Sequence, residues 1–339
     1  MMPVSRRRKL VFGLITILLA SGVGVIGLAG ADIYVHWRTQ DVAGVNVWGY
    51  RGSPVGAKRD GEVRVAMIGG STVYGWGLPA HESIAAFLER RLNASATAHR
   101  FSVLNLGAPG QGAYGFVTDL ADYADLDYDI VCMYEGYNDL GPLTIRGRSN
   151  YLLWRRESPV FRWTGYYPIL PVVLKEKADL MTGGEKTRDG AVRFRAGVGT
   201  RVASGAMRAV AAVTGDLAGQ VGGLTPAPAN APIDGECIAT WAQYCGSVRD
   251  AIAWSLSRDK RVIFVTQPYV SDEHKEQQAN VASMLKTRFG ADPRVTYLNL
   301  GDAIDMTNRD IAYDGLHLIA SGNDTIASRL VAPVLEAAR

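Results

Sequence analysis

The chain has 339 residues, of which 47% are hydrophobic and 20% charged, so it can form a substantial core and is not disordered as a whole. Its net charge is only +3 and comes partly from one basic block at residues 6–9. Nucleic acid binding needs a basic stripe on the folded domain, so we expect no nucleic acid partner.

The first predicted element follows the basic block. Residues 10–31 contain no charged side chain, and about 20 apolar residues suffice to cross a bilayer as a helix. Basic residues before such a span stay in the cytoplasm. Residues 1–31 therefore predict a single-pass anchor in the cytoplasmic membrane, with the rest of the chain on the periplasmic or extracellular side. Two alternatives stay open: a cleaved signal peptide, because Ala29-Gly30-Ala31 resembles a cleavage site, and a buried core helix.

A connector and one α/β domain follow in the predicted order. Residues 32–62 are polar and glycine-rich, and residues 63–339 form the domain. We predict strands at 63–68, 101–106, 129–134, 261–266 and 295–300, and helices at 83–93, 113–124, 241–258, 272–289 and 321–338. Strands that alternate with helices predict a parallel sheet covered on both faces, which gives a three-layer α/β/α domain.

An insertion at about 143–236 interrupts this alternation between the third and fourth strands. It begins with aromatic and basic residues, continues with an alanine-rich helical segment at 202–217, and includes a glycine- and proline-rich loop at 222–232. Aromatic residues mixed with arginines suit a lid or a membrane-facing surface. A solvated cover over the edge of the sheet is the alternative.

The three cysteines show no zinc-site spacing. Cys132 lies in an apolar strand pattern and is predicted to be buried. Cys237 and Cys245 would be about 12 Å apart on one continuous helix and could not bond. If Cys237 lies in the loop before that helix, a disulfide becomes feasible in an oxidising compartment.

Residues that can carry chemistry follow the strands, where a parallel sheet gathers its reactive groups. Ser71 follows the first strand in Gly69-Gly70-Ser71-Thr72, a turn that would expose its hydroxyl over the edge of the sheet. A serine nucleophile needs a base within hydrogen-bond reach and a group that orients the base. Considered alone, Ser71 fits a helix cap better than a nucleophile.

The base and the oxyanion donors are predicted from three later blocks. Asp314-Gly-Leu-His317 follows the fifth strand, and its spacing lets one carboxylate orient one imidazole. Gly110 ends Asn-Leu-Gly-Ala-Pro-Gly after the second strand, and Asn138 follows the third strand in Gly-Tyr-Asn-Asp. Both can donate to an oxyanion, although each alone fits ordinary turn chemistry. We expect Asp139 to secure its loop by hydrogen bonding.

The four blocks and their order resemble the SGNH/GDSL hydrolase family over about residues 46–142 and 260–339. The resemblance implies a flavodoxin-like fold of five parallel strands. It implies Ser71 as nucleophile, His317 as base and Asp314 as its partner, with an oxyanion hole of Ser71, Gly110 and Asn138. No metal or organic cofactor is implied. The serine block contains Gly-Gly-Ser-Thr in place of Gly-Asp-Ser-Leu, but the missing aspartate has none of these roles.

The sequence thus predicts a serine esterase that hydrolyses short acyl esters, with an acylated glycan or a lipid among its candidate substrates. A cell-envelope polysaccharide O-acyltransferase or deacetylase, and a non-catalytic accessory subunit that uses the fold as a scaffold, are the alternatives. The stretch from Gly110 to Gly115 also fits the dinucleotide pattern G-x-G-x-x-G. It follows the second strand, however, and no acidic residue ends the next strand to bind a ribose, so we do not expect a nicotinamide site.

Overall fold

The computed structural model describes residues 5–42, 44–95, 98–140, 158–171, 174 and 237–339. The predicted helical segment at 202–217 and the loop at 222–232 lie outside the described residues. Five strands are present: β1 (Glu62–Gly69), β2 (Arg100–Asn105), β3 (Ile130–Tyr134), β4 (Arg261–Thr266) and β5 (Val295–Asn299). Each coincides with a predicted strand to within one or two residues.

The strands form one parallel sheet in the order β2-β1-β3-β4-β5. This is the flavodoxin-like order, in which the chain switches direction across the sheet between β1 and β3. β3 is buried along its whole length and consists of apolar residues without interruption, as expected for a strand covered on both faces. Ligand sites in such sheets lie outside the carboxyl ends of the strands at the switch point, which here is the end of β1.

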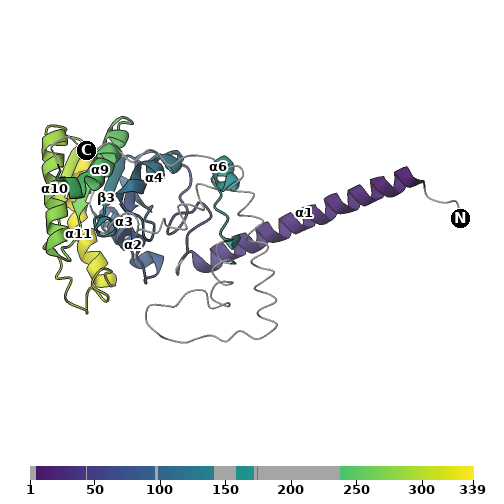
Figure 1. The fold of residues 1–339 in the computed structure, drawn as a ribbon, viewed down its shortest axis with the longest axis horizontal. Coiled ribbons are helices and arrows are strands. Elements are labelled where there is room, and N and C mark those ends of the chain that lie inside the picture. Colours follow the sequence, from purple (N-terminus) through teal and green to yellow (C-terminus); the bar gives the residue numbers. More distant parts are fainter. Residues whose placement is uncertain (1–4, 43, 96–97, 141–157, 172–173, 175–236) are drawn as a thin grey trace.

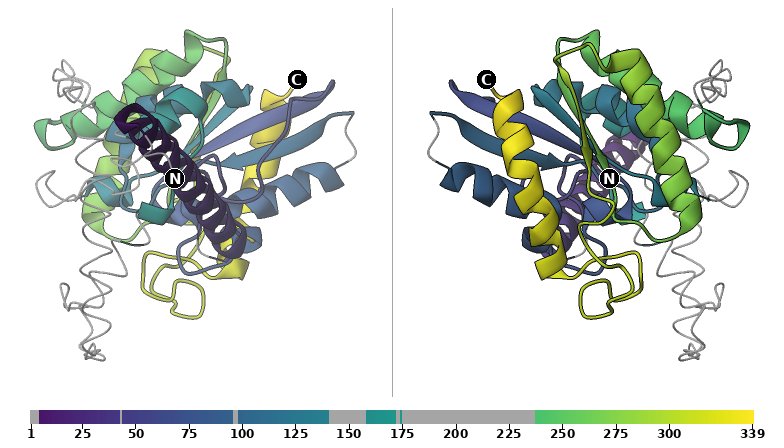
Figure 2. Two further views of the ribbon diagram at one scale, coloured as in Figure 1. Left: turned by 90° about the vertical axis from the view of Figure 1, so that its right-hand side faces the viewer. Right: turned by 90° about the vertical axis from the view of Figure 1, so that its left-hand side faces the viewer.

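Helices cover both faces of the sheet and confirm the three-layer prediction (Figures 1 and 2). α3 (Ile84–Ala94) and α11 (Ala320–Ala337) pack on one face, where Leu88 and Leu330 are fully buried. α4 (Phe116–Asp122), α9 (Ala242–Leu256) and α10 (Asp272–Phe289) pack on the other, where Phe116 and Ile252 are fully buried. Full burial of such a side chain stabilises the fold by about 1.5–3 kcal/mol.

α1 (Arg6–Thr39) is a single helix that extends well away from the domain (Figure 1). It is long and apolar enough to cross a membrane, and its most apolar window is 0% buried, which argues against the buried core helix. The helix continues eight residues into the predicted connector because no glycine or proline interrupts residues 32–39. Asp32 and His36 are the buried residues of α1.

Cys237 lies in the loop before α9, which is the condition for a disulfide between Cys237 and Cys245. Cys237 precedes the short 3₁₀ helix η5 (Ala239–Trp241) and lies outside α9, which contains Cys245. The Cα atoms of the two cysteines are 6.6 Å apart and their sulfur atoms form a disulfide. Cys132 in β3 is a buried free thiol, as predicted.

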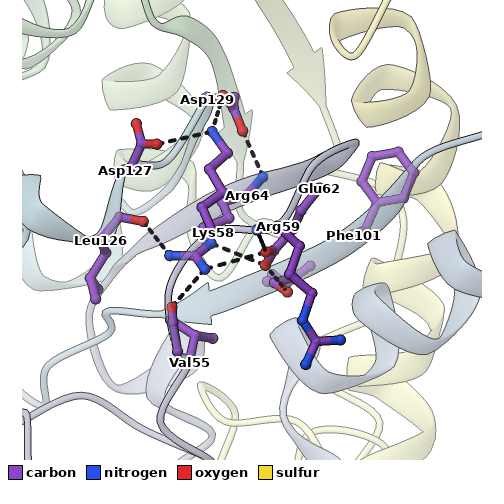
Figure 3. A network of polar contacts seen from close by, with 12 residues as sticks. Val55, Lys58, Arg59, Glu62, Arg64, Phe101, Leu126, Asp127 and Asp129 are labelled. Atoms are coloured by element: carbon purple, nitrogen blue, oxygen red, sulfur yellow. Dashed lines mark hydrogen bonds and ion pairs between the residues drawn. The ribbon is translucent and has the colours of Figure 1, made fainter.

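A buried ion pair secures the end of the sheet opposite the carboxyl ends of the strands (Figure 3). Arg64 Nε donates to Glu62 Oε1 at 3.0 Å, and both side chains are almost fully buried. Ser102 Oγ donates to the same oxygen at 2.6 Å. Burial alone would raise the pKa of Glu62, but hydrogen bonds from the Arg64 side chain, Ser102 and the Arg59 backbone outweigh it and lower the pKa to about 2.

We expect Glu62→Gln to destabilise the fold by about 3 kcal/mol at neutral pH, because Arg64 would stay buried without its counter-charge. The folded pKa lies below the ordinary value of 4.5, so this stability is complete above that value and is lost as pH falls towards the folded pKa. Urea unfolding at pH 7 and at low pH measures both effects. A variant that is equally destabilised at the two pH values would contradict the ionic origin of the effect.

Candidate active site

Ser71 begins the short helix α2 (Ser71–Tyr74), directly after β1 at the switch point of the sheet. The two glycines before it are explained by close packing. A Cβ atom at Gly70 would collide with the Asn138 amide and would lie 2.8 Å from Glu135 Oε2. Behind Ser71, Thr72 Oγ1 accepts a hydrogen bond of 2.8 Å from Gln267 Nε2 at the end of β4. The serine is thus held over the carboxyl ends of the central strands.

The structure brings Ser71 together with the two residues predicted from the distant Asp-x-x-His block. Ser71 Oγ lies 2.7 Å from His317 Nε2, and His317 Nδ1 lies 2.6 Å from Asp314 Oδ2. An ionised carboxylate can only accept hydrogen bonds, so Nδ1 carries the proton and Nε2 presents its lone pair to the serine hydroxyl. Ser71 therefore donates to His317, which is the arrangement a general base requires.

Asp314 is fixed by its own backbone as well as by the imidazole. Its Oδ1 accepts N–H bonds from Leu316 at 2.9 Å and from His317 at 2.8 Å, which leaves Oδ2 for the ring. Partial burial alone would raise the pKa of Asp314, but the hydrogen bonds from the His317 ring and from these two N–H groups outweigh it and hold the pKa below its ordinary value. The carboxylate therefore stays ionised at neutral pH.

Sequence reasoning missed Tyr313, which supports the imidazole from one side. Its ring stacks on His317 with a centroid distance of 6.0 Å and an interplanar angle of 21°. Its hydroxyl donates to the Trp76 carbonyl at 3.1 Å, in the loop that follows the serine helix. Trp76 and Tyr313 are both substantially exposed, so two aromatic rings lie at the rim of the site.

Asn138 and Gly110, the two predicted oxyanion donors, belong to loops that meet beside Gly70. Asn138 Nδ2 donates to the Gln111 carbonyl at 2.9 Å and to Glu135 Oε1 at 3.2 Å. Gly110 is exposed, has a left-handed φ of 73°, and immediately precedes Gln111. Asp139 Oδ2 accepts the Ala113 N–H at 2.8 Å and ties the two loops together, as predicted for this residue.

Packing within this loop explains the second and third glycines of the dinucleotide-like pattern. A Cβ atom at Gly112 would lie 2.5 Å from Asp139 Oδ1, and one at Gly115 would lie 2.6 Å from Gln111 Nε2. Among the described residues, no group of three or more His, Cys, Asp or Glu side chains is arranged to hold a metal ion.

No family model and no curated protein matches the chain. Similar solved structures include a putative lipolytic protein of the G-D-S-L family from Desulfitobacterium hafniense DCB-2, with 12% identity, a TM-score of 0.42 and coverage of 80% of this chain and 98% of that one. A lipase/acylhydrolase from Enterococcus faecalis has 13% identity and a TM-score of 0.41 over 80% and 95% of the two chains. A GDSL-like lipase from Bacteroides thetaiotaomicron VPI-5482 has 12% identity and a TM-score of 0.43 over 84% and 93%.

Glu135 is a buried acid beneath the site whose importance the sequence did not reveal. Its Oε1 accepts the N–H groups of Gly136 at 3.1 Å and Asn138 at 3.2 Å, in addition to the Asn138 side chain. Its Oε2 has no hydrogen-bond partner among the described residues. Burial, followed by the nearby charge of Asp139, raises the pKa of Glu135 to about 8, although neighbouring N–H groups oppose the rise. The protonated form is therefore more favoured at Glu135 than in an exposed glutamate.

If the side-chain amide of Asn138 donates to the oxyanion, the charge on Glu135 should affect how readily that amide can do so. Above pH 8 an ionised Glu135 would hold the amide hydrogen more tightly and would repel a developing oxyanion. We expect kcat for an ester to fall above pH 8 in the wild type. Glu135→Gln, which imitates the protonated acid, should keep its neutral activity and lose this decline. A pH–rate profile from pH 6 to 10 measures both variants, and an identical alkaline decline in the two would contradict the role of Glu135.

Proposed function

We propose that this chain is a serine hydrolase of the SGNH type that cleaves acyl esters, with Ser71 as its nucleophile. The observation that carries the proposal is the continuous hydrogen-bonded chain from Ser71 Oγ to His317 to Asp314, with distances of 2.7 and 2.6 Å. A hydroxyl is a weak nucleophile until an adjacent base removes its proton, and this chain supplies the base and its orienting group.

In the proposed reaction, His317 takes the proton of Ser71 as the serine oxygen attacks the ester carbonyl carbon. Asp314 stabilises the imidazolium that forms. The imidazolium then protonates the leaving alcohol as the carbon–oxygen bond of the ester breaks, which leaves an acyl-enzyme on Ser71. His317 next takes a proton from a water molecule as the water attacks the acyl carbon. It returns that proton to Ser71 Oγ as the bond between this oxygen and the acyl carbon breaks, which releases the acid and the free serine.

We propose that the N–H groups of Ser71 and Gly110 and the amide of Asn138 stabilise the oxyanion. Ser71 begins α2, so its N–H has no partner within the helix and is available to substrate. Of the two bonds that the Asn138 amide makes, the one to Glu135 is the longer, at 3.2 Å. That hydrogen is the one that would turn to the oxyanion, because burial favours the protonated form of Glu135, and a protonated carboxyl accepts only weakly.

We also propose that α1 anchors the domain in the cytoplasmic membrane. The basic residues 6–9 precede the apolar span and favour a cytoplasmic N-terminus. The disulfide between Cys237 and Cys245 lies in the domain beyond the span and suits an oxidising compartment. The two features agree on a periplasmic or extracellular domain. Retention in membranes after alkaline carbonate washing, with the disulfide intact, tests this placement.

Hydrolysis of p-nitrophenyl acetate and of longer esters by the purified full-length chain tests the proposed activity. Ser71→Ala should abolish hydrolysis while the circular dichroism spectrum stays unchanged, and the series of acyl lengths should favour short chains. Undiminished hydrolysis by this variant would refute the role of Ser71. Acyl transfer to an added glycan in preference to water would instead identify the transferase.

A further inference from the structure

We propose that the folded domain lies against the outer surface of the bilayer and contacts lipid headgroups through α6 (Pro159–Thr164) and the last turns of α1. The proposal rests on α1 being the membrane anchor. It differs from the anchor itself, because an anchored domain can equally hang in solvent from a flexible tether. Three observations carry it: the depth of the contacts with α1, the rigidity of those contacts, and the exposed residues of α6.

The depth follows from the length of the helix. Residues 10–31, at a rise of about 1.5 Å per residue, measure about 33 Å, which matches a hydrocarbon core of about 30 Å. Residues 32–39 add about 12 Å of helix, whereas one headgroup layer is about 5–8 Å thick. Whatever packs against Asp32 and His36 therefore lies at the level of the headgroups.

Asp32 holds the segment that follows α6 at the depth of the lipid headgroups. Its carboxylate accepts the Ile169 N–H at 2.9 and 3.0 Å and the Leu170 N–H at 3.3 and 3.2 Å. Its side chain is buried, at 5% exposed, although it is the first charged residue after the apolar span. A charge at the edge of a bilayer is tolerated when its hydrogen bonds are supplied by protein, as they are here.

His36, one turn further along α1, makes a second attachment. Its Nδ1 lies 2.8 Å from the Val45 carbonyl oxygen and its Nε2 lies 2.7 Å from the Tyr167 carbonyl oxygen. Carbonyl oxygens only accept, so a ring nitrogen donates wherever one of these contacts is a hydrogen bond. One buried side chain thereby ties α1 both to the chain that follows it and to the segment after α6.

The connector after α1 is also held in place and is not a free linker. The guanidinium of Arg51 donates to the carbonyls of Val42 at 3.0 Å, Gly44 at 2.9 Å and Leu78 at 2.5 Å. Arg51 is 3% exposed, so these bonds lie inside the protein. The orientation of the domain relative to α1 is thus set by buried polar contacts at both ends of the junction.

α6 buries one side and exposes the other. Phe161 packs edge-on against Tyr123 and Tyr167, with centroid distances of 6.1 and 6.3 Å. Trp163 is 85% exposed and Val160 is 47% exposed, and Arg162 between them is exposed as well. Tryptophan and arginine are residues that favour the interface between a membrane and water.

The end of α1 presents residues of the same kind. Tyr34 is 59% exposed and Trp37 is 67% exposed, within the eight residues beyond the apolar span. α6 lies on the side of the domain from which α1 emerges, and α10 lies on the opposite side (Figure 1). The exposed aromatic residues of the two helices are thus placed where the headgroups of the anchored chain would be.

A fluorescent label on α6 tests the proposal. The full-length Val160→Cys variant keeps Trp163 and gains an accessible thiol, whereas Cys132 is buried and the other two cysteines form a disulfide. It is labelled with an NBD dye and reconstituted in vesicles of phosphatidylcholine and phosphatidylglycerol that contain doxyl-labelled lipid. We expect strong quenching and a blue shift. Ser283→Cys, exposed on α10, is the matched control and should show neither.

The attachment to α1 is tested by adding Asp32→Ala to the Val160→Cys variant. We expect most of the quenching to be lost while the protein remains in membranes after carbonate washing. With Asp32 intact, an unquenched label in carbonate-resistant Val160→Cys protein would overturn the surface contact and leave the anchor standing. Full quenching that persists in the Asp32→Ala variant would contradict the role given to Asp32. A blue-shifted label that doxyl lipid does not quench would show that protein covers α6, and this also overturns the proposal. Release of the chain by carbonate would instead refute the anchor.

Discussion

Replacing His317 by glutamine is expected to lower kcat/KM for p-nitrophenyl acetate by about 10⁴–10⁶-fold. Glutamine can still form a hydrogen bond with Ser71, whose Oγ lies 2.7 Å from the imidazole, but it cannot take the proton. The loss therefore measures general base catalysis and not the loss of a contact. Steady-state kinetics on the folded variant gives the value directly.

The combination of this variant with Ser71→Ala provides the control. Residues that act as one unit have effects that do not add, so the double variant should have the same residual rate as either single variant. That residual rate would come from substrate binding and the oxyanion donors. A double variant whose loss equals the product of the two single losses would show that Ser71 and His317 act independently, against the proposed mechanism.

Asp314→Asn is expected to lower kcat about 10⁴-fold although the two side chains have the same shape. Asp314 Oδ1 accepts two backbone N–H groups, so the asparagine oxygen must take that position. The asparagine NH₂ group then faces His317 Nδ1 in place of Oδ2 and donates to it. This places the imidazole proton on Nε2, where it opposes the Ser71 hydroxyl and cannot accept its proton.

Two further variants separate this effect on the tautomer from a general loss of charge. Asp310→Asn removes an exposed carboxylate from the same loop and should leave kcat unchanged. Asp314→Ala removes the orienting group without imposing the wrong tautomer, so it should lower kcat no more than Asp314→Asn does. Near-normal turnover by Asp314→Asn would mean that the carboxylate does not set the state of the imidazole.

Much of the fold could be predicted because its strands and helices are indicated by the order of apolar and polar residues within short segments of the chain. β1, β3 and β4 are short apolar runs separated by amphipathic helices, and such alternation leads to a parallel sheet whatever the tertiary detail. The site residues could be predicted for a related reason. Ser71 and Asn138 each lie within a few residues of the end of a strand, and the carboxyl ends of parallel strands meet at one edge.

The remainder depends on contacts between distant segments, which leave no periodic signal. The raised pKa of Glu135 comes first from its complete burial, which the residues beside it along the chain do not reveal. The link between His36 and Tyr167 joins residues 131 positions apart. The polar residues after the apolar span predict a connector from residue 32, whereas α1 continues to Thr39. Asp32 and His36 lie in this part of the helix and contact backbone groups of the domain, which the local sequence does not indicate.

Reaction with a fluorophosphonate probe, followed by peptide mapping, tests the central claim most directly, because such probes phosphonylate only a serine that a neighbouring base activates. The proposed mechanism predicts one modified serine, Ser71, in the full-length wild-type chain and none in the His317→Gln variant. An unmodified Ser71 in correctly folded protein, or a modification of Ser71 that persists without His317, would contradict it.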